Sequence, residues 1–67
     1  MPWTPKYFPP SMLRLSPPVR AKAIAIANAL LEEGSEEGRA IRIAIARAEQ
    51  WAEARGMRLF ASARGQP

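Results

Sequence analysis

Residues 30–38 read Leu-Leu-Glu-Glu-Gly-Ser-Glu-Glu-Gly, and this stretch decides the fold. Apolar residues recur at helical spacing on both sides of it, over residues 17–33 and 36–55. Gly34 suits the left-handed conformation that ends many helices, and Ser35 can cap the helix that follows. Because only these two residues separate the helices, the sequence predicts a mainly α fold built on an antiparallel two-helix hairpin.

The first predicted helix, residues 17–33, has clear signals at its start. Ser16 is a suitable N-cap, and Pro17 and Pro18 cost no hydrogen bond because first-turn N–H groups lack helical partners. Asn28 lies at the edge of the apolar face of this helix. We expect the amide of Asn28 to make a structural hydrogen bond rather than to bind a ligand.

The second predicted helix, residues 36–55, has an apolar arc of roughly 200°, against the ~100° that one neighbouring helix needs. An arc this wide requires a second contact surface, which either the N-terminal segment or another copy of the protein can supply. The candidate interface residues are Ala40, Ile43, Ala44, Ala48 and Trp51. The alanines recur every fourth residue and would let a second helix approach closely, although alanine is also simply a good helix former.

Two segments lie outside the predicted helices, one before them and one after them. Residues 1–16 hold most of the prolines together with large apolar side chains, so we expect a Pro-rich arm that packs across the hairpin. Residues 57–67 form a tail that alternates briefly like a strand. The tail can pair with the extended stretch near residues 3–7, or it can continue as a frayed helix.

A chain of 67 residues forms one small domain, here residues 1–67, with a core that gives little stability on its own. Small domains often add disulfides, a metal or a partner subunit. The absence of cysteine excludes disulfides, and the absence of histidine as well argues against a structural zinc site. Self-association is the support that remains.

No stretch of the sequence approaches the ~20 apolar residues that cross a bilayer, so we expect no membrane span. The N-terminus also lacks the basic and then apolar regions of a signal peptide, so the expected location is the cytoplasm. The net charge of +4 comes from outside the helices, since residues 19–55 are neutral. The excess charge lies on Lys6, Arg14, Arg58 and Arg64. We therefore do not expect specific nucleic-acid binding, and weak, salt-sensitive binding through these basic arms is the alternative.

Histidine, cysteine and aspartate are all absent, so a serine–histidine triad, a thiol nucleophile and a histidine metal site are excluded within this chain. We expect no enzyme activity and no cofactor. The concentrated polar feature is the acidic turn, whose carboxylates Glu32, Glu33, Glu36 and Glu37 are the candidate site for a hard cation. Solvated helix ends explain the acidic turn better, because its spacing is not that of a calcium loop.

Several short motifs of this chain fall in the order found in a known family. They are Met1-Pro2-Trp3, Leu15-Ser16-Pro17, Lys22-Ala23-Ile24, Ile26-Ala27-Asn28-Ala29-Leu30, Glu36-Glu37-Gly38-Arg39-Ala40-Ile41, Ala44-Ile45-Ala46 and Trp51. Over about residues 1–55 the chain resembles the N-terminal segment of YdaT-type small bacterial proteins. It is more distantly similar to the ChaB family of cation-transport regulators, although Ile41 stands where a ChaB histidine would fall. The resemblance implies a small bacterial intracellular protein with a link to stress responses, and it transfers no active-site residue.

These observations together predict a non-catalytic protein–protein interaction module that self-associates as a homo-oligomer. The alternatives are weak nucleic-acid binding through the basic arms and cation-linked regulation through the acidic turn.

Overall fold

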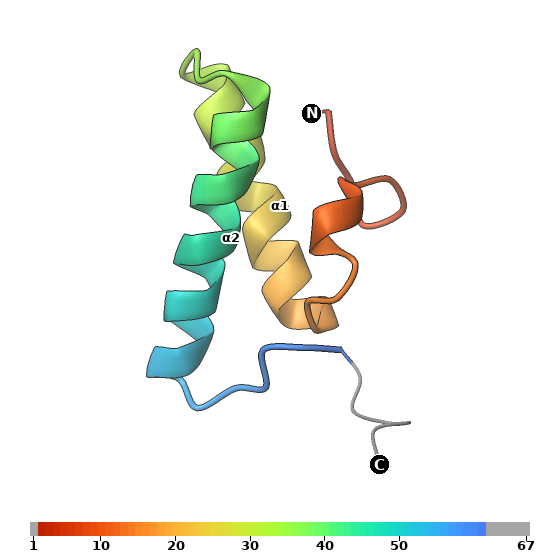
Figure 1. The fold of residues 1–67 in the computed structure, drawn as a ribbon, viewed down its shortest axis with the longest axis vertical. Helices are drawn as coiled ribbons and strands as arrows, with labels where there is room; N and C mark the ends of the chain where they lie inside the picture. Colours follow the sequence, from red (N-terminus) through yellow and green to blue (C-terminus); the bar gives the residue numbers. More distant parts are fainter. Residues whose placement is uncertain (1, 62–67) are drawn as a thin grey trace.

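The computed structural model describes residues 2–61 and consists of two packed helices with an N-terminal arm beside them. The elements are a 3₁₀ helix η1 (Pro10–Met12), α1 (Pro17–Glu32) and α2 (Glu37–Ala54). Helices α1 and α2 run antiparallel and are joined by a tight turn at one end of the molecule (Figure 1). The predicted mainly α hairpin is confirmed: α1 begins at the predicted residue, and the other three helix bounds lie one residue inside the predicted ones.

Glycine ends both helices as the sequence predicts. Gly34 has φ +99° and Gly56 has φ +67°, a region that side-chain-bearing residues rarely adopt. After α1, the Ser35 N–H donates to the Leu30 carbonyl and the Gly34 N–H donates to the Leu31 carbonyl, both at 3.0 Å. The same pair of bonds follows α2, so each helix ends in a Schellman motif.

The N-terminal caps differ from the prediction. Glu36, and not Ser35, is the N-cap of α2, and its side chain accepts a hydrogen bond from the Arg39 N–H at 3.3 Å. Ser16 is the N-cap of α1 but makes no side-chain cap bond. Its hydroxyl instead donates to the Arg58 carbonyl at 2.8 Å, because the two prolines that follow Ser16 reduce the N–H groups available for capping.

The core lies between the two helices and under the arm. On α2 it consists of small side chains, since Ala40, Ala44, Ala48 and Ala52 are all fully buried. Side chains this short let the two helix axes come close. The larger side chains of the core on α1 include Val19 and Ile24. The buried apolar set is Trp3, Met12, Leu15, Val19, Ala23, Ile24, Ala27, Ala40, Ala44, Ala48 and Ala52.

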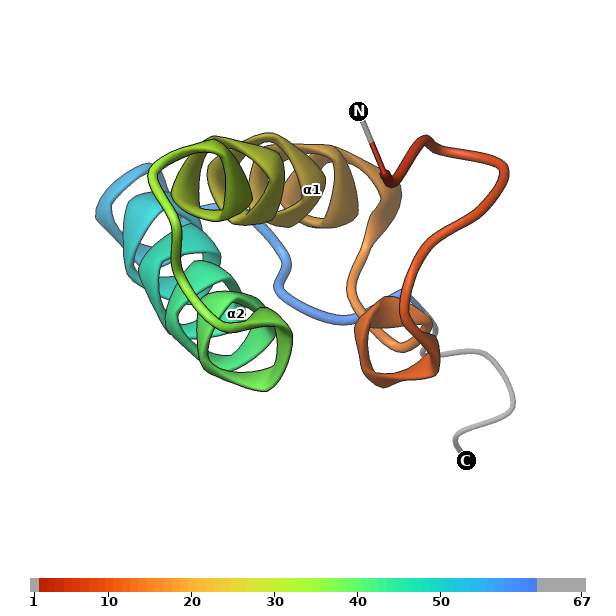
Figure 2. The same cartoon turned by 90° about the horizontal axis from the view of Figure 1, so that it is seen from above.

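The arm packs on the hairpin, as its apolar residues suggest. Trp3, Met12 and Leu15 are buried, and the arm places η1 beside α2 on the same side of α1 (Figure 2). A turn at the start of the arm is closed by two backbone hydrogen bonds between Thr4 and Tyr7. The arm therefore contributes part of the core, which explains how a two-helix hairpin can be covered.

The segment after α2 lies against the end of the arm, and not against residues 3–7 as one prediction had it. The Ser16 N–H donates to the Leu59 carbonyl at 2.9 Å, and the Ala61 N–H donates to the Arg14 carbonyl at 2.7 Å. This pairing is a single isolated bridge between Leu15 and Phe60, so no sheet forms within residues 2–61. The rest of the predicted tail, residues 62–67, lies outside the described residues.

Neither helix is long and apolar enough to cross a membrane within the part of the chain that the structure describes.

Candidate functional site

The structure divides the predicted interface residues into two groups. Ala40, Ala44 and Ala48 are fully buried against this chain's own core, so another copy cannot reach them while the hairpin is closed. Ile43 and Trp51 are half-buried and remain accessible. The small residues of the apolar arc of α2 are thus used inside the molecule, where they share one core cluster with residues of α1 and of the arm.

Trp51 lies between two cations of its own chain. The Lys22 Nζ stands 5.3 Å from the centroid of the indole ring, and the Arg55 guanidinium carbon stands 5.0 Å from it. Contacts of this kind are worth about 0.5–1 kcal/mol at exposed sites. Trp51 also packs against the core cluster, so its environment is that of a packing residue.

A groove that the sequence did not reveal runs between η1 and α2. It has a volume of about 560 Å³ and is lined by Pro10, Ser11, Leu13, Arg14 and Ile45. Figure 2 shows the ribbons of η1 and α2 on the same side of α1. Leu13 is 63% exposed there and adds a large apolar side chain to the lining of the groove. Pattern reading along one helix could not find this groove, because its two walls come from segments about 30 residues apart.

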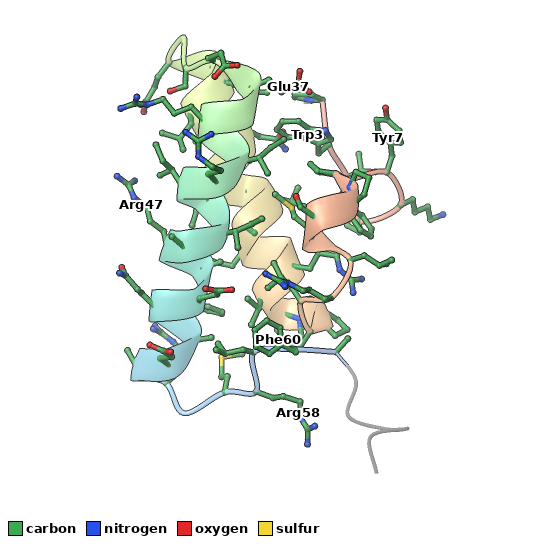
Figure 3. The ribbon with its side chains drawn as sticks, in the orientation of Figure 1. Trp3, Tyr7, Glu37, Arg47, Arg58 and Phe60 are labelled. Atoms are coloured by element: carbon green, nitrogen blue, oxygen red, sulfur yellow. The ribbon has the colours of Figure 1, made fainter. Side chains whose placement is uncertain are left out.

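Basic and aromatic side chains gather at the end of the molecule where α2 finishes. The Arg14 guanidinium lies over the Phe60 ring, 5.5 Å from its centroid, and Phe60 is 44% exposed. Arg58 lies at this same end, whereas Glu37 lies at the opposite end beside the helical turn (Figure 3). We call the region of Arg14, Arg55 and Arg58 the basic end.

The candidate cation ligands do not converge. Glu32, Glu33, Glu36 and Glu37 are all exposed around the acidic turn. Within residues 2–61, no three carboxylates come close enough to hold a metal ion. One oxygen of Glu36 is already engaged by the helix that it caps. The acidic turn therefore acts as a negative pole at one end of the molecule, and the basic end forms the positive pole.

Asn28 makes the structural hydrogen bond that the sequence predicts, and its partner is the arm. Its Oδ1 accepts from the Trp3 N–H at 3.3 Å, and its Nδ2 donates to the Trp3 carbonyl at 3.0 Å. A smaller, mostly apolar cleft of about 260 Å³ lies beside it, lined by Trp3, Thr4, Pro5, Ala21, Ile24, Ala25 and Asn28. Both polar groups of the amide are satisfied, so this cleft offers a ligand no unpaired polar atom of Asn28.

Arg20 holds the other half of the arm. Its guanidinium donates to the carbonyls of Met12, Leu13 and Leu15 at 2.8–3.2 Å and stacks on Phe8, 4.9 Å from the ring centroid. From the sequence alone, Arg20 enters only the charge balance of residues 19–55, and no contact is predicted for it. Its position in α1, one turn after Ser16, is the sequence signal that places it near the arm.

Comparison with known proteins shows similarity to a bacterial protein. Over 53 residues the chain is 58% identical to uncharacterised protein YdaT of Bacillus subtilis (strain 168). The match covers 79% of this chain and 35% of that relative, so the chain spans about a third of the relative's length. This match confirms the predicted similarity to a YdaT-type protein.

No family model matches the chain, and the wider similarity to ChaB stays a prediction. No solved structure matches it either.

Proposed function

We propose that this domain is a non-catalytic protein–protein interaction module that self-associates through the groove between η1 and α2. The observation that carries the proposal is the exposure of Leu13, which lines a mostly apolar groove together with Ile45. Burying such side chains yields about 25 cal/mol for each Å² of apolar surface removed from water. A domain of this size is stabilised when an apolar partner surface packs against it. Disulfides cannot supply that stability here, because the chain has no cysteine.

A second copy is the partner that the distribution of charge favours. The four glutamates of the acidic turn stand at one end of the molecule. Arg58 lies at the other end (Figure 3), where Arg55 ends α2 and Arg14 lies over the ring of Phe60. Two copies that meet with opposite orientation bring each negative pole near a positive one. The absence of histidine, cysteine and aspartate supports a non-catalytic role. The name of the YdaT relative states no activity that could be transferred to this chain.

The direct test is the solution mass of the wild-type chain, measured by light scattering across a hundredfold range of concentration. We expect a dimer or a larger closed assembly whose proportion rises with concentration. Leu13→Glu places a charge in the groove and should shift the population to the monomer. Ala29→Glu is the matched control, because it adds the same charge at an exposed position on α1 outside the groove.

A wild-type chain that stays monomeric at every concentration refutes the proposal. A Leu13→Glu variant that associates as well as the Ala29→Glu variant would show that self-association uses another surface.

A further inference from the structure

The side of α2 that borders the groove has a charge pattern of its own. Ile45 lines the groove, with Arg42 three residues before it and Glu49 four residues after it. Residues three and four apart lie on one helix face, so these three side chains form one stripe with a cation at one end and an anion at the other. Arg42 is exposed and Glu49 is half-buried, and neither appears in the buried core.

We propose that two copies of this chain pair through this stripe, α2 against α2 and antiparallel, with the two-fold axis beside Ile45. The inference rests on the proposed self-association and adds its geometry. The midpoint between positions 42 and 49 falls next to Ile45. An antiparallel pairing centred there places Arg42 of each copy opposite Glu49 of the other, so the interface gains two equivalent ion pairs. An isologous contact requires this self-complementary arrangement.

The poles of the whole molecule favour the same orientation. Antiparallel helices place the acidic turn of one copy toward the basic end of the other, and Figure 3 shows Glu37 and Arg58 at these two ends of the chain. A parallel pairing would instead oppose like charges at both ends and along the stripe. Like-charge contacts across an interface are a strong penalty, so they exclude the parallel orientation.

The opposite side of α2 is a poorer surface for a second copy. There Arg47, Trp51 and Arg55 follow one another at intervals of four residues, and Lys22 of α1 stands over the same indole. Figure 3 shows Arg47 on the side of α2 that faces away from η1. Two copies that met on this side would bring cations against cations, and they would have to displace the contacts that already cover Trp51.

The test is a charge swap. Arg42→Glu leaves two acidic groups in each stripe, and Glu49→Arg leaves two basic ones. Either variant alone should weaken self-association by roughly tenfold at low salt, because each of two equivalent ion pairs becomes a repulsion. The double variant Arg42→Glu/Glu49→Arg should recover the wild-type affinity. An equimolar mixture of the two single variants should form a heterodimer, since every pair is then again of opposite charge.

Arg47→Glu is the control, because it makes the same charge change on the other side of α2. Sedimentation velocity at several concentrations measures the affinities, and circular dichroism verifies that each variant keeps its helices. Self-association of the wild type that neither single variant weakens, or a mixture that fails to form the heterodimer, overturns the antiparallel stripe and leaves the proposed function standing. A monomeric wild type refutes the proposed function itself, and the inference with it.

Discussion

The contact between Asn28 and the arm gives the sharpest prediction about stability. Asn28 is 4% exposed, and its amide makes two hydrogen bonds with the backbone of Trp3, whose side chain is 6% exposed. Asn28→Ala removes both bonds and leaves the N–H and carbonyl of Trp3 without these partners in a buried place. We therefore predict that the start of the arm, around Trp3, detaches from α1 much more readily in this variant.

The expected loss follows from the two bonds. A typical hydrogen bond contributes about 1 kcal/mol net, and a buried group left unpaired costs about as much again or more. Alanine recovers part of this because it is the better helix former. The balance is a destabilisation of about 2 kcal/mol, in a chain whose total stability is on the order of 3–10 kcal/mol. For a domain of this size that loss lowers Tm by roughly 10 °C.

The assay uses the two tryptophans. In a Trp51→Phe background the fluorescence reports Trp3 alone, so thermal melts and acrylamide quenching follow the arm directly. Asn28→Ala should lower Tm and raise the quenching of Trp3 at 25 °C. Gln50→Ala is the control, because it truncates an exposed amide on α2 and should change the stability by less than about 0.5 kcal/mol.

Two results would refute the reasoning. One is an Asn28→Ala variant that melts within a degree of the control. The other is a Trp3 that stays shielded from acrylamide after the substitution, which would mean that side-chain packing alone holds the arm.

Three further predictions concern single positions, each tested by chemical denaturation. Gly34→Ala should destabilise the fold by about 1 kcal/mol because Gly34 has φ +99°. Gly38→Ala should instead stabilise it by about 0.5 kcal/mol, because a Cβ there meets only the Glu36 carboxylate, with its two oxygens at 3.6 and 3.8 Å. Equal effects of the two would contradict the role of the turn. Arg20→Lys should cost about 1–2 kcal/mol, since lysine can neither reach three carbonyls nor stack as guanidinium does, and Arg47→Lys at an exposed site should cost almost nothing. Ser16→Ala should cost about 1 kcal/mol through loss of its 2.8 Å bond to the segment after α2, and a neutral result would mean that water replaces this bond freely.

The parts of the fold that the sequence predicts are those set by local chemistry. Gly34 and Gly56 end the helices because only a residue without a Cβ adopts positive φ cheaply, and this preference is visible in one position at a time. The apolar arcs predicted the buried face of each helix in the same way. The position of Ser16 was predicted too, but not the partner of its hydroxyl, because that partner lies 42 residues away.

The candidate site was beyond prediction for a related reason. The wide arc of α2 predicted that this helix needs a second contact surface, yet it could not say which residues the chain would cover itself. Ala44 and Ala48 are covered by α1, while Ile45, which is larger and adjacent to Ala44, lines the groove. That choice depends on where the arm lies, and the arm is positioned by long-range contacts that have no periodic signal.

Three polar side chains from the start and body of α1 explain how a domain without disulfides holds its irregular segments. Ser16, Arg20 and Asn28 follow one another at intervals of four and eight residues, so they advance along one side of the helix. Each bonds to backbone groups: Ser16 to the segment after α2, Arg20 to η1 and the residues after it, and Asn28 to the start of the arm. Because they recognise carbonyls and an N–H rather than side chains, they fix the path of the arm while leaving the outward-facing side chains of the arm unconstrained. Leu13 is one of these, so the residue that most strongly indicates an interaction surface is exposed by the same contacts that stabilise the fold.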